Sequence, residues 1–213
     1  MKRIALIVIM ALIAVMNTSF SQTASTINTS GVQTQETGLG DLTADALRAS
    51  TGAQIAFVPA GSFKEATVPA DRIKYADVNS FLQYPDDPVN VMTLTGAQIM
   101  KALERSVLLF PQKNMGFLQV SGLTFTFNPK RPRNSRVTAA ILSGRAKIDL
   151  NAKYKVATTR PFANGAYGYF TIWGNDKDRI TDSGITINKA VKDYIAKDDL
   201  PDYTFQERII QAK

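Results

Sequence analysis

Closely spaced carboxylates are the first residues of this chain whose type and spacing could support chemistry. Acidic pairs occur at Asp86-Asp87, at Asp176 and Asp178, and at Asp198-Asp199. Carboxylate oxygens suit Mg²⁺ or Ca²⁺. None of the pairs has the spacing of a recognised metal-binding loop, and each has the turn-like surroundings in which exposed aspartate is common. We therefore predict no metal or other cofactor in this chain.

Histidine and cysteine are both absent from the 213 residues. A Ser-His-Asp triad and a Cys-His pair are excluded, as is any metal site that uses imidazole, the commonest metal-binding side chain. Without cysteine there is also no disulfide and no lipid attached to a cysteine. Carboxylates, cations and aromatic rings remain as candidates for a functional site.

The amino-terminal residues have the pattern of a secretory signal peptide. A basic start, Met1-Lys2-Arg3, precedes an apolar run from Ile4 to Met16, and small residues at Ser19 and Ser21 favour cleavage after Ser21. The alternative is an uncleaved anchor, but a helix needs about 20 apolar residues to span a bilayer. We therefore expect a periplasmic or secreted protein without a stable membrane anchor.

The rest of the chain divides into a short leader and one domain. Gln22 to Gln35 is rich in Ser, Thr and Gln and predicts a flexible leader. From Glu36 to Lys213 no linker or internal repeat interrupts the alternation of helix-like and strand-like segments. This predicts a single mixed α/β domain.

The clearest structural element is a strand that runs directly into a helix, Val91 to Val107. Thr95 and Gln98 have the spacing of a capping box, and the apolar residues that follow recur every three or four positions until Pro111. We also expect helices before Gly52 and at 73–82 and 187–195, and strands at 54–58, 117–120, 123–127, 137–142, 154–158 and 207–210. Residues 59–64, 84–88 and 161–170 are expected to be loops.

Several segments together resemble one family. They are ETGLGDLTADALR from Glu36, VPADRIKYADV from Val68, LTGAQIMKALERSV from Leu94, GFLQVSGLTFTFNP from Gly116, YKVATT from Tyr154 and NGAYGYF from Asn164. Their order, spacing and residues are similar to those of the C-terminal domain of the 5'-nucleotidase family, which includes the periplasmic UDP-sugar hydrolases. The resemblance implies an α+β fold of four layers, α/β/β/α, that holds the nucleotide.

In that family a separate N-terminal metallophosphatase domain binds two metal ions through Asp, His and Asn side chains and performs the hydrolysis. Nothing in this chain resembles that domain. The resemblance therefore implies a substrate-recognition domain that stands alone, with two divalent metals on a separate catalytic partner.

The resemblance also points to candidate ligand-binding residues, because three loops correspond to the family's recognition loops. Where the family has NGGGIR, this chain reads Pro59 to Lys64, so Lys64 replaces the arginine and Pro59 the asparagine. Lys64 keeps a charge that could hold a phosphate, but it lacks the planar fork of arginine.

The other two loops supply aromatic residues and a carboxylate. Tyr84 and Asp87 lie in the loop that carries one aromatic side of the family's base clamp. Phe162 lies beside the position of the second aromatic, and Tyr167 replaces the aspartate that binds ribose. These aromatic rings could stack on a base, although loop aromatics also pack structurally, and Asp87 could instead cap its own turn.

The basic segment NPKRPRNSR, Asn128 to Arg136, has two interpretations. Clustered cations could bind nucleic acid, but the family has a comparable Pro-rich connection here. A solvated hairpin loop is favoured, and no nucleic-acid partner is predicted.

Three hypotheses of function follow from the sequence. The first is a domain that binds a nucleotide or nucleoside and takes part in phosphate ester hydrolysis together with a separate metallophosphatase chain. The second is a non-catalytic binding module with diverged ligand or protein specificity. The third, an enzyme that acts alone, is disfavoured because attack of water on a phosphate ester needs a metal-activated nucleophile or an equivalent.

Overall fold

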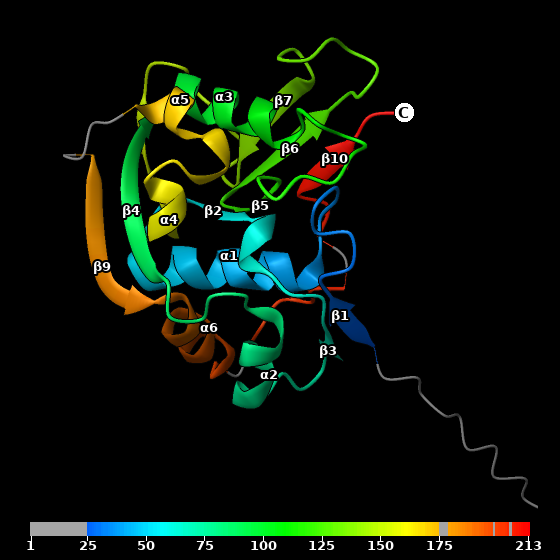
Figure 1. The fold of residues 1–213 in the computed structure, drawn as a ribbon, viewed down its shortest axis with the longest axis vertical. Coiled ribbons are helices and arrows are strands. Elements are labelled where there is room, and N and C mark those ends of the chain that lie inside the picture. The colour runs from blue at the N-terminus through cyan, green and yellow to red at the C-terminus, as the bar shows by residue number, and fades with distance from the viewer. Residues whose placement is uncertain (1–24, 175–178, 198, 205) are drawn as a thin grey trace, which may run out of the picture.

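A computed structural model of the chain describes residues 25–174, 179–197, 199–204 and 206–213 (Figure 1). The signal peptide expected at Met1 to Ser21 lies outside the described residues. Within the described ranges, no helix has the length and apolar character needed to span a bilayer.

A five-stranded mixed sheet forms the centre of the molecule, in the order β5-β2-β8-β4-β9. Its strands are β2 (Ile55–Pro59), β4 (Pro88–Thr95), β5 (Leu118–Ser121), β8 (Lys153–Thr159) and β9 (Ile180–Thr186). β2 and β8 are parallel, and the other neighbouring strands are antiparallel. All residues of β2 are buried, as expected for a central strand covered on both faces.

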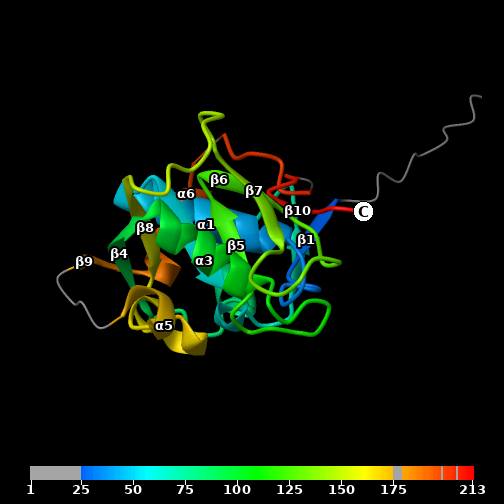
Figure 2. The same cartoon turned by 90° about the horizontal axis from the view of Figure 1, so that it is seen from above.

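Two smaller sheets accompany it. One has the order β10-β6-β7 and contains β6 (Leu123–Phe127), β7 (Val137–Leu142) and β10 (Ile209–Gln211), with β10 parallel to β6. The other pairs β1 (Thr26–Asn28) with β3 (Thr67–Pro69). The five-stranded and three-stranded sheets lie between α1 (Gly38–Thr51) with α6 (Ile187–Ile195) on one side and α3 (Gly96–Ser106) on the other (Figures 1 and 2).

The capping box predicted at the start of α3 is confirmed. The Thr95 side chain accepts from the backbone N–H of Gln98, and the Gln98 side chain accepts from the backbone N–H of Thr95. At the other end, Arg136 from the basic loop donates to the backbone oxygens of Val107 and Phe110 at 2.8 and 3.0 Å. At least one cation of that loop therefore closes a helix end.

The expected leader is only partly separate from the domain. β1 lies inside it, Ile27 is 2% exposed, and Thr29 Oγ1 donates to the backbone oxygen of Lys64 at 2.8 Å. The prediction of a flexible segment up to Gln35 is therefore wrong for the part from Ser25 onward. Its few apolar side chains pack against the core, and its backbone pairs with β3.

The stretch from Pro161 to Phe170 was also expected to be a loop, and it is mostly helical. It contains the short helix α4 (Arg160–Ala163), the 3₁₀ turn η2 (Ala166–Gly168) and the start of α5 (Phe170–Trp173). The remaining elements are α2 (Tyr75–Phe81) and the 3₁₀ turn η1 (Ala60–Ser62). Burial of Phe162, Tyr169 and Trp173 orders the segment that contains α4, η2 and α5. Each of these is about one turn long, which is too short to show a helical period in the sequence.

Candidate ligand-binding site

Three loops meet where β2 and β8 end and β4 begins. The parallel pairing of β2 with β8 places Pro59 and Thr159 at the same edge of the sheet, and Val89 near the start of β4 lies opposite Thr159. A cavity of about 310 Å³ opens at this edge. It is lined by Pro59, Ser62, Tyr84, Asp87, Thr159, Pro161, Phe162, Ala166 and Tyr167. We call it the aromatic cavity.

Four of the five predicted site residues line this cavity, although they are up to 83 positions apart in the chain. Tyr84 is 54% exposed and Tyr167 is 40% exposed, so both rings can meet a ligand. Partial burial, together with the nearby Tyr84 and Asp87, raises the pKa of the Tyr167 phenol above its ordinary value. Its hydroxyl is therefore neutral and can donate a hydrogen bond at neutral pH.

Asp87 belongs to a loop that is fixed by its backbone. Its N–H donates to the oxygen of Tyr84 at 3.1 Å, and its own backbone oxygen accepts from Ile187 at 2.9 Å. Burial and the neighbouring Asp86 raise the pKa of the Asp87 carboxyl. The lining that the structure describes contains no other charged side chain.

Phe162 does not act as a free clamp. Its side chain is fully buried, with ring centroids 4.5 Å from Tyr169 and 5.2 Å from Trp173. It forms part of the cavity wall because it packs in the core. Phe162, which lies beside the family's second clamp position at Pro161, is therefore a structural residue.

Lys64 lies away from the aromatic cavity. Its ammonium group donates to the backbone oxygen of Asn79 at 2.8 Å, and its side chain borders a different hollow next to Thr29. The extended backbone at Phe63 explains this placement, because successive side chains point to opposite sides and Phe63 is buried. The expectation that Lys64 joins the other four residues is wrong.

Sequence reasoning missed Ser62 and Thr159, which also line the cavity. Ser62 lies in η1, where its backbone oxygen accepts from Gln83 at 2.8 Å. Thr159 is the last residue of β8. Ligands often bind beyond the carboxyl ends of parallel strands, and this rule points to Thr159. Its use requires the pairing of β2 with β8, which the sequence does not reveal.

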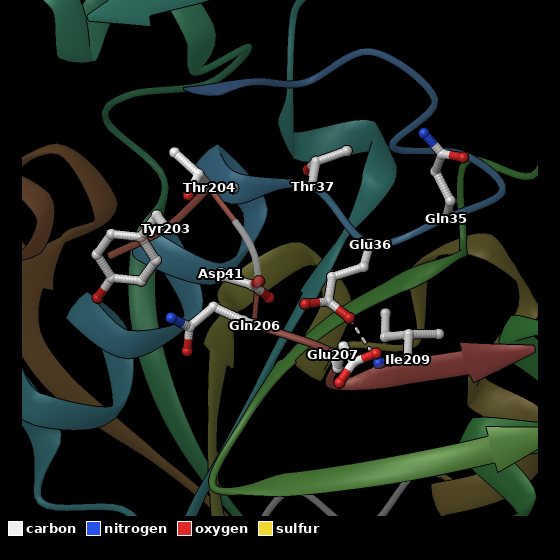
Figure 3. A pocket seen from close by; sticks show the side chains of 10 residues that line it. Gln35, Glu36, Thr37, Asp41, Tyr203, Thr204, Gln206, Glu207 and Ile209 are labelled. Carbon is white, nitrogen blue, oxygen red and sulfur yellow. Dashed lines mark hydrogen bonds between the residues drawn. The ribbon is translucent and has the colours of Figure 1, made fainter. Parts of the chain in front are cut away.

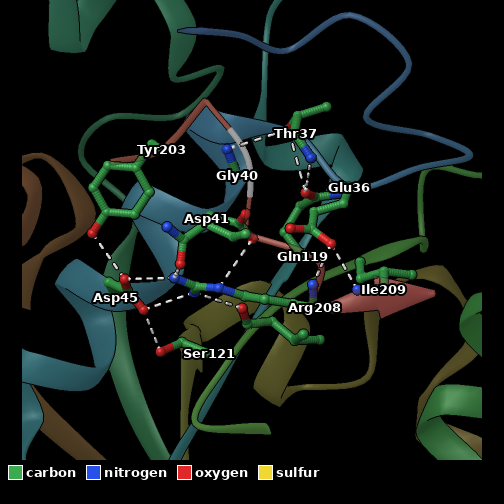
Figure 4. Close-up of polar contacts among 12 residues, drawn as sticks. Glu36, Thr37, Gly40, Asp41, Asp45, Gln119, Ser121, Tyr203, Arg208 and Ile209 are labelled. Carbon is green, nitrogen blue, oxygen red and sulfur yellow. Dashed lines mark hydrogen bonds and ion pairs between the residues drawn. The ribbon is translucent and has the colours of Figure 1, made fainter. Parts of the chain in front are cut away.

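A second cavity, of about 350 Å³, lies where the carboxyl-terminal segment crosses the start of α1 (Figure 3). Its lining includes Glu36 and Asp41, two members of a set of ionisable residues that we call the buried ionic cluster: Glu36, Asp41, Asp45 and Arg208 (Figure 4). Arg208 donates to both oxygens of Asp45 at 2.8 Å, and Glu36 accepts from the backbone N–H groups of Arg208 and Ile209 at 2.6 Å. These contacts hold β10 beside α1.

The two aspartates of this cluster have opposite pKa shifts. Burial disfavours the charged form of Asp45, but hydrogen bonds and positive charge from Arg208 outweigh it and lower its pKa. Asp41 Oδ1 lies 3.7 Å from Arg208 Nε. For Asp41 the effect of burial exceeds the opposing effect of the Arg208 charge and raises the pKa of the carboxyl to about 9. Asp41 is therefore protonated at neutral pH.

A mixed α/β domain with a partly aromatic cavity at its parallel strand ends has an architecture in which small-molecule sites are often found. The family of the 5'-nucleotidase C-terminal domain matches residues 13–173, and the chain belongs to this family.

Two curated relatives are similar over part of the chain. The 5'-nucleotidase of Diplobatis ommata is 32% identical over 114 residues, which are 50% of this chain and 19% of that protein. The trifunctional nucleotide phosphoesterase protein YfkN of Bacillus subtilis (strain 168) is 29% identical over 146 residues, or 65% of this chain and 10% of that protein. The chain thus spans less than a fifth of the length of either relative.

Solved structures confirm the predicted fold. The 5'-nucleotidase precursor of Thermus thermophilus superposes with a TM-score of 0.79 and 28% identity, covering 88% of this chain and 38% of that one. The NAD nucleotidase of Haemophilus influenzae has a TM-score of 0.70 at 17% identity, covering 83% and 33%. The fold is therefore that of the 5'-nucleotidase C-terminal domain.

Proposed function

We propose that this chain is an exported nucleotide-recognition domain that holds the nucleoside part of its ligand in the aromatic cavity. The supporting observation is that two partly exposed tyrosines and one carboxylate line a single cavity in a chain of this family. Aromatic faces stack on any base. The Asp87 carboxylate can accept hydrogen bonds from sugar hydroxyls.

The charge of the cavity favours the base and sugar over the phosphate. Asp87 is the charged member of the described lining, and Lys64 lies elsewhere. A phosphate inside the cavity would be repelled by this carboxylate, so we propose that it projects from the mouth. Adenosine and AMP should then bind with dissociation constants that differ by no more than about threefold, or about 0.7 kcal/mol.

Calorimetry on the purified chain with adenosine, AMP and UDP-glucose tests ligand binding. We expect micromolar binding of at least one of them, and Tyr84→Ala should weaken it about tenfold through loss of base stacking. Tyr75→Ala is a matched control, because Tyr75 is 55% exposed but lies on α2 outside the cavity lining. Absence of binding by all three probes would contradict the proposal.

We further propose that hydrolysis of the phosphate ester requires a separate metallophosphatase chain that binds two divalent metals. The sequence supports this division of labour, because it has no histidine and no segment that resembles the family's catalytic domain. Phosphate release from AMP should then appear only when both chains are mixed, and a chelator should abolish it. Release by this chain alone in the presence of chelator would contradict a two-chain mechanism.

A diverged binding module is the second candidate. It is favoured by one observation: the family's recognition asparagine and arginine are replaced by Pro59 and by Lys64, which points away from the cavity. This candidate predicts no measurable binding of nucleosides or nucleotides. The calorimetric experiment therefore separates the two functions.

A further inference from the structure

The backbone at Tyr167 has a conformation that large side chains avoid. Its φ of 57° and ψ of 23° lie in the left-handed region, which costs an L-residue about 1–2 kcal/mol relative to the right-handed one. The ring is 40% exposed, so complete burial does not offset this cost. Strained residues of this kind persist where their surroundings fix them, and they cluster at ligand-binding sites.

Arg105 from α3 fixes this peptide. Its Nε and Nη2 atoms donate to the backbone oxygen of Tyr167 at 3.0 and 2.6 Å. The guanidinium carbon also lies 5.6 Å from the centroid of the Tyr169 ring, whose hydroxyl donates to the backbone oxygen of Gly116 at 2.7 Å. Two hydrogen bonds from the planar guanidinium group converge on this one oxygen and restrict the position of the Tyr167 peptide.

Glycines from three segments provide the space for this arrangement. A Cβ atom at Gly168 would lie 2.0 Å from Arg105 Nη2, and one at Gly61 would lie 2.1 Å from the Tyr167 hydroxyl oxygen. A Cβ atom at Gly116 would lie 3.1 Å from the Tyr167 Cβ atom. The backbone of η1 and the approach to β5 therefore leave room for the Tyr167 residue in its observed position.

We propose that Arg105 is the positioning residue of the aromatic cavity: its contacts with the Tyr167 peptide hold the Tyr167 ring ready for a planar ligand. Arg105 does not belong to the described cavity lining and acts only through Tyr167. A ring that is already ordered loses less conformational entropy when the ligand binds. The effect on affinity depends on the proposed function, whereas the effect on the ring does not.

A double-mutant cycle tests whether Arg105 acts through Tyr167. We expect Arg105→Met and Tyr167→Ala each to weaken adenosine binding about tenfold, and the double variant to bind no more weakly than Tyr167→Ala. Arg105→Lys should recover part of the loss, because it retains one donor. Lys101→Met, an exposed change on the same helix, should bind as the wild type does. Additive losses, which are expected of independent sites, would overturn the proposal.

An experiment without ligand tests the ring itself. In protein labelled with 3-fluorotyrosine, Tyr167→Phe assigns the Tyr167 fluorine resonance. We expect this resonance to shift or broaden in Arg105→Met and, to a smaller extent, in Arg105→Lys, and to be unchanged in Lys101→Met. An unchanged resonance in a folded Arg105→Met protein would overturn the proposal. If the resonance moves but the wild type binds none of adenosine, AMP and UDP-glucose, the positioning role stands and the proposed function fails.

Discussion

The aromatic cavity and the buried ionic cluster both concentrate polar groups, but they use them in different ways. In the cluster, Asp45 accepts from Arg208, from Ser121 at 2.5 Å and from Tyr203 at 2.8 Å. In the cavity, the Tyr84 and Tyr167 rings remain partly exposed, and strain at Tyr167 is maintained by Arg105. Paired buried charges such as those of Asp45 and Arg208 have a structural role, whereas groups that are held in place but left accessible indicate a ligand site.

Removal of Arg208 should have the largest effect on stability. Arg208→Met leaves Asp45 as a buried, unpaired carboxylate, so we expect the free energy of unfolding to fall by about 3–5 kcal/mol. Urea denaturation of the variant measures this loss. Nucleoside binding of the folded fraction should be unchanged, because Arg208 does not line the aromatic cavity.

Arg160→Met is the matched control for this change. It removes the ion pair between Arg160 and Asp182. The side chains of these two residues are 45% and 51% exposed. Such exposed pairs contribute about 1 kcal/mol or less. If both substitutions destabilise the protein equally, the cluster does not have the structural role that distinguishes it from the cavity.

Asp41 should make stability depend on pH in a predictable direction. The folded state raises its pKa from 3.8 to about 9, so in this range it keeps a proton that the unfolded chain releases. The contribution of Asp41 to the free energy of unfolding therefore falls as the pH rises from about 4 to 9. Asp41→Asn, which cannot ionise, should be more stable than the wild type by an excess that grows toward pH 8 and reaches about 1 kcal/mol or more.

Denaturation at several pH values between 5 and 8 measures this excess. Asp45→Asn serves as the contrast, because the pKa of Asp45 is lowered and its charge is paired with Arg208. That variant should be less stable than the wild type throughout. An excess for Asp41→Asn that is constant with pH would mean that Asp41 is ionised in the fold.

The sequence predicts the local elements of the structure better than it predicts the buried ionic cluster. The capping box at Thr95 and the strands at 123–127 and 137–142 depend on neighbouring residues, and they were predicted correctly. No ion pair was predicted for Asp41 or Asp45. Their partner Arg208 is 163 positions from Asp45 and lies beside a parallel strand pair that no local pattern reveals.

The same distinction applies to the candidate site. Tyr84, Asp87, Phe162 and Tyr167, which the resemblance suggested, line one cavity, because the family's scaffold fixes where its loops meet. The resemblance did not give the direction of the Lys64 side chain or the burial of Phe162, which depend on packing within each loop. The contact between Arg105 and Tyr167 was also missed, since it joins two segments through a side chain and a backbone oxygen.

Glycine substitutions give the smallest and most specific comparison. At Tyr167, whose φ is 57°, we expect Tyr167→Gly to be more stable than Tyr167→Ala by about 1 kcal/mol, because only glycine adopts the left-handed conformation without strain. At Tyr84, where φ is not positive, the order should reverse, since glycine there only adds conformational freedom to the unfolded chain. Thermal denaturation of the four variants measures both differences. If alanine is the more stable residue at both positions, the strain at Tyr167 is absent, and Arg105 has no unfavourable conformation to maintain.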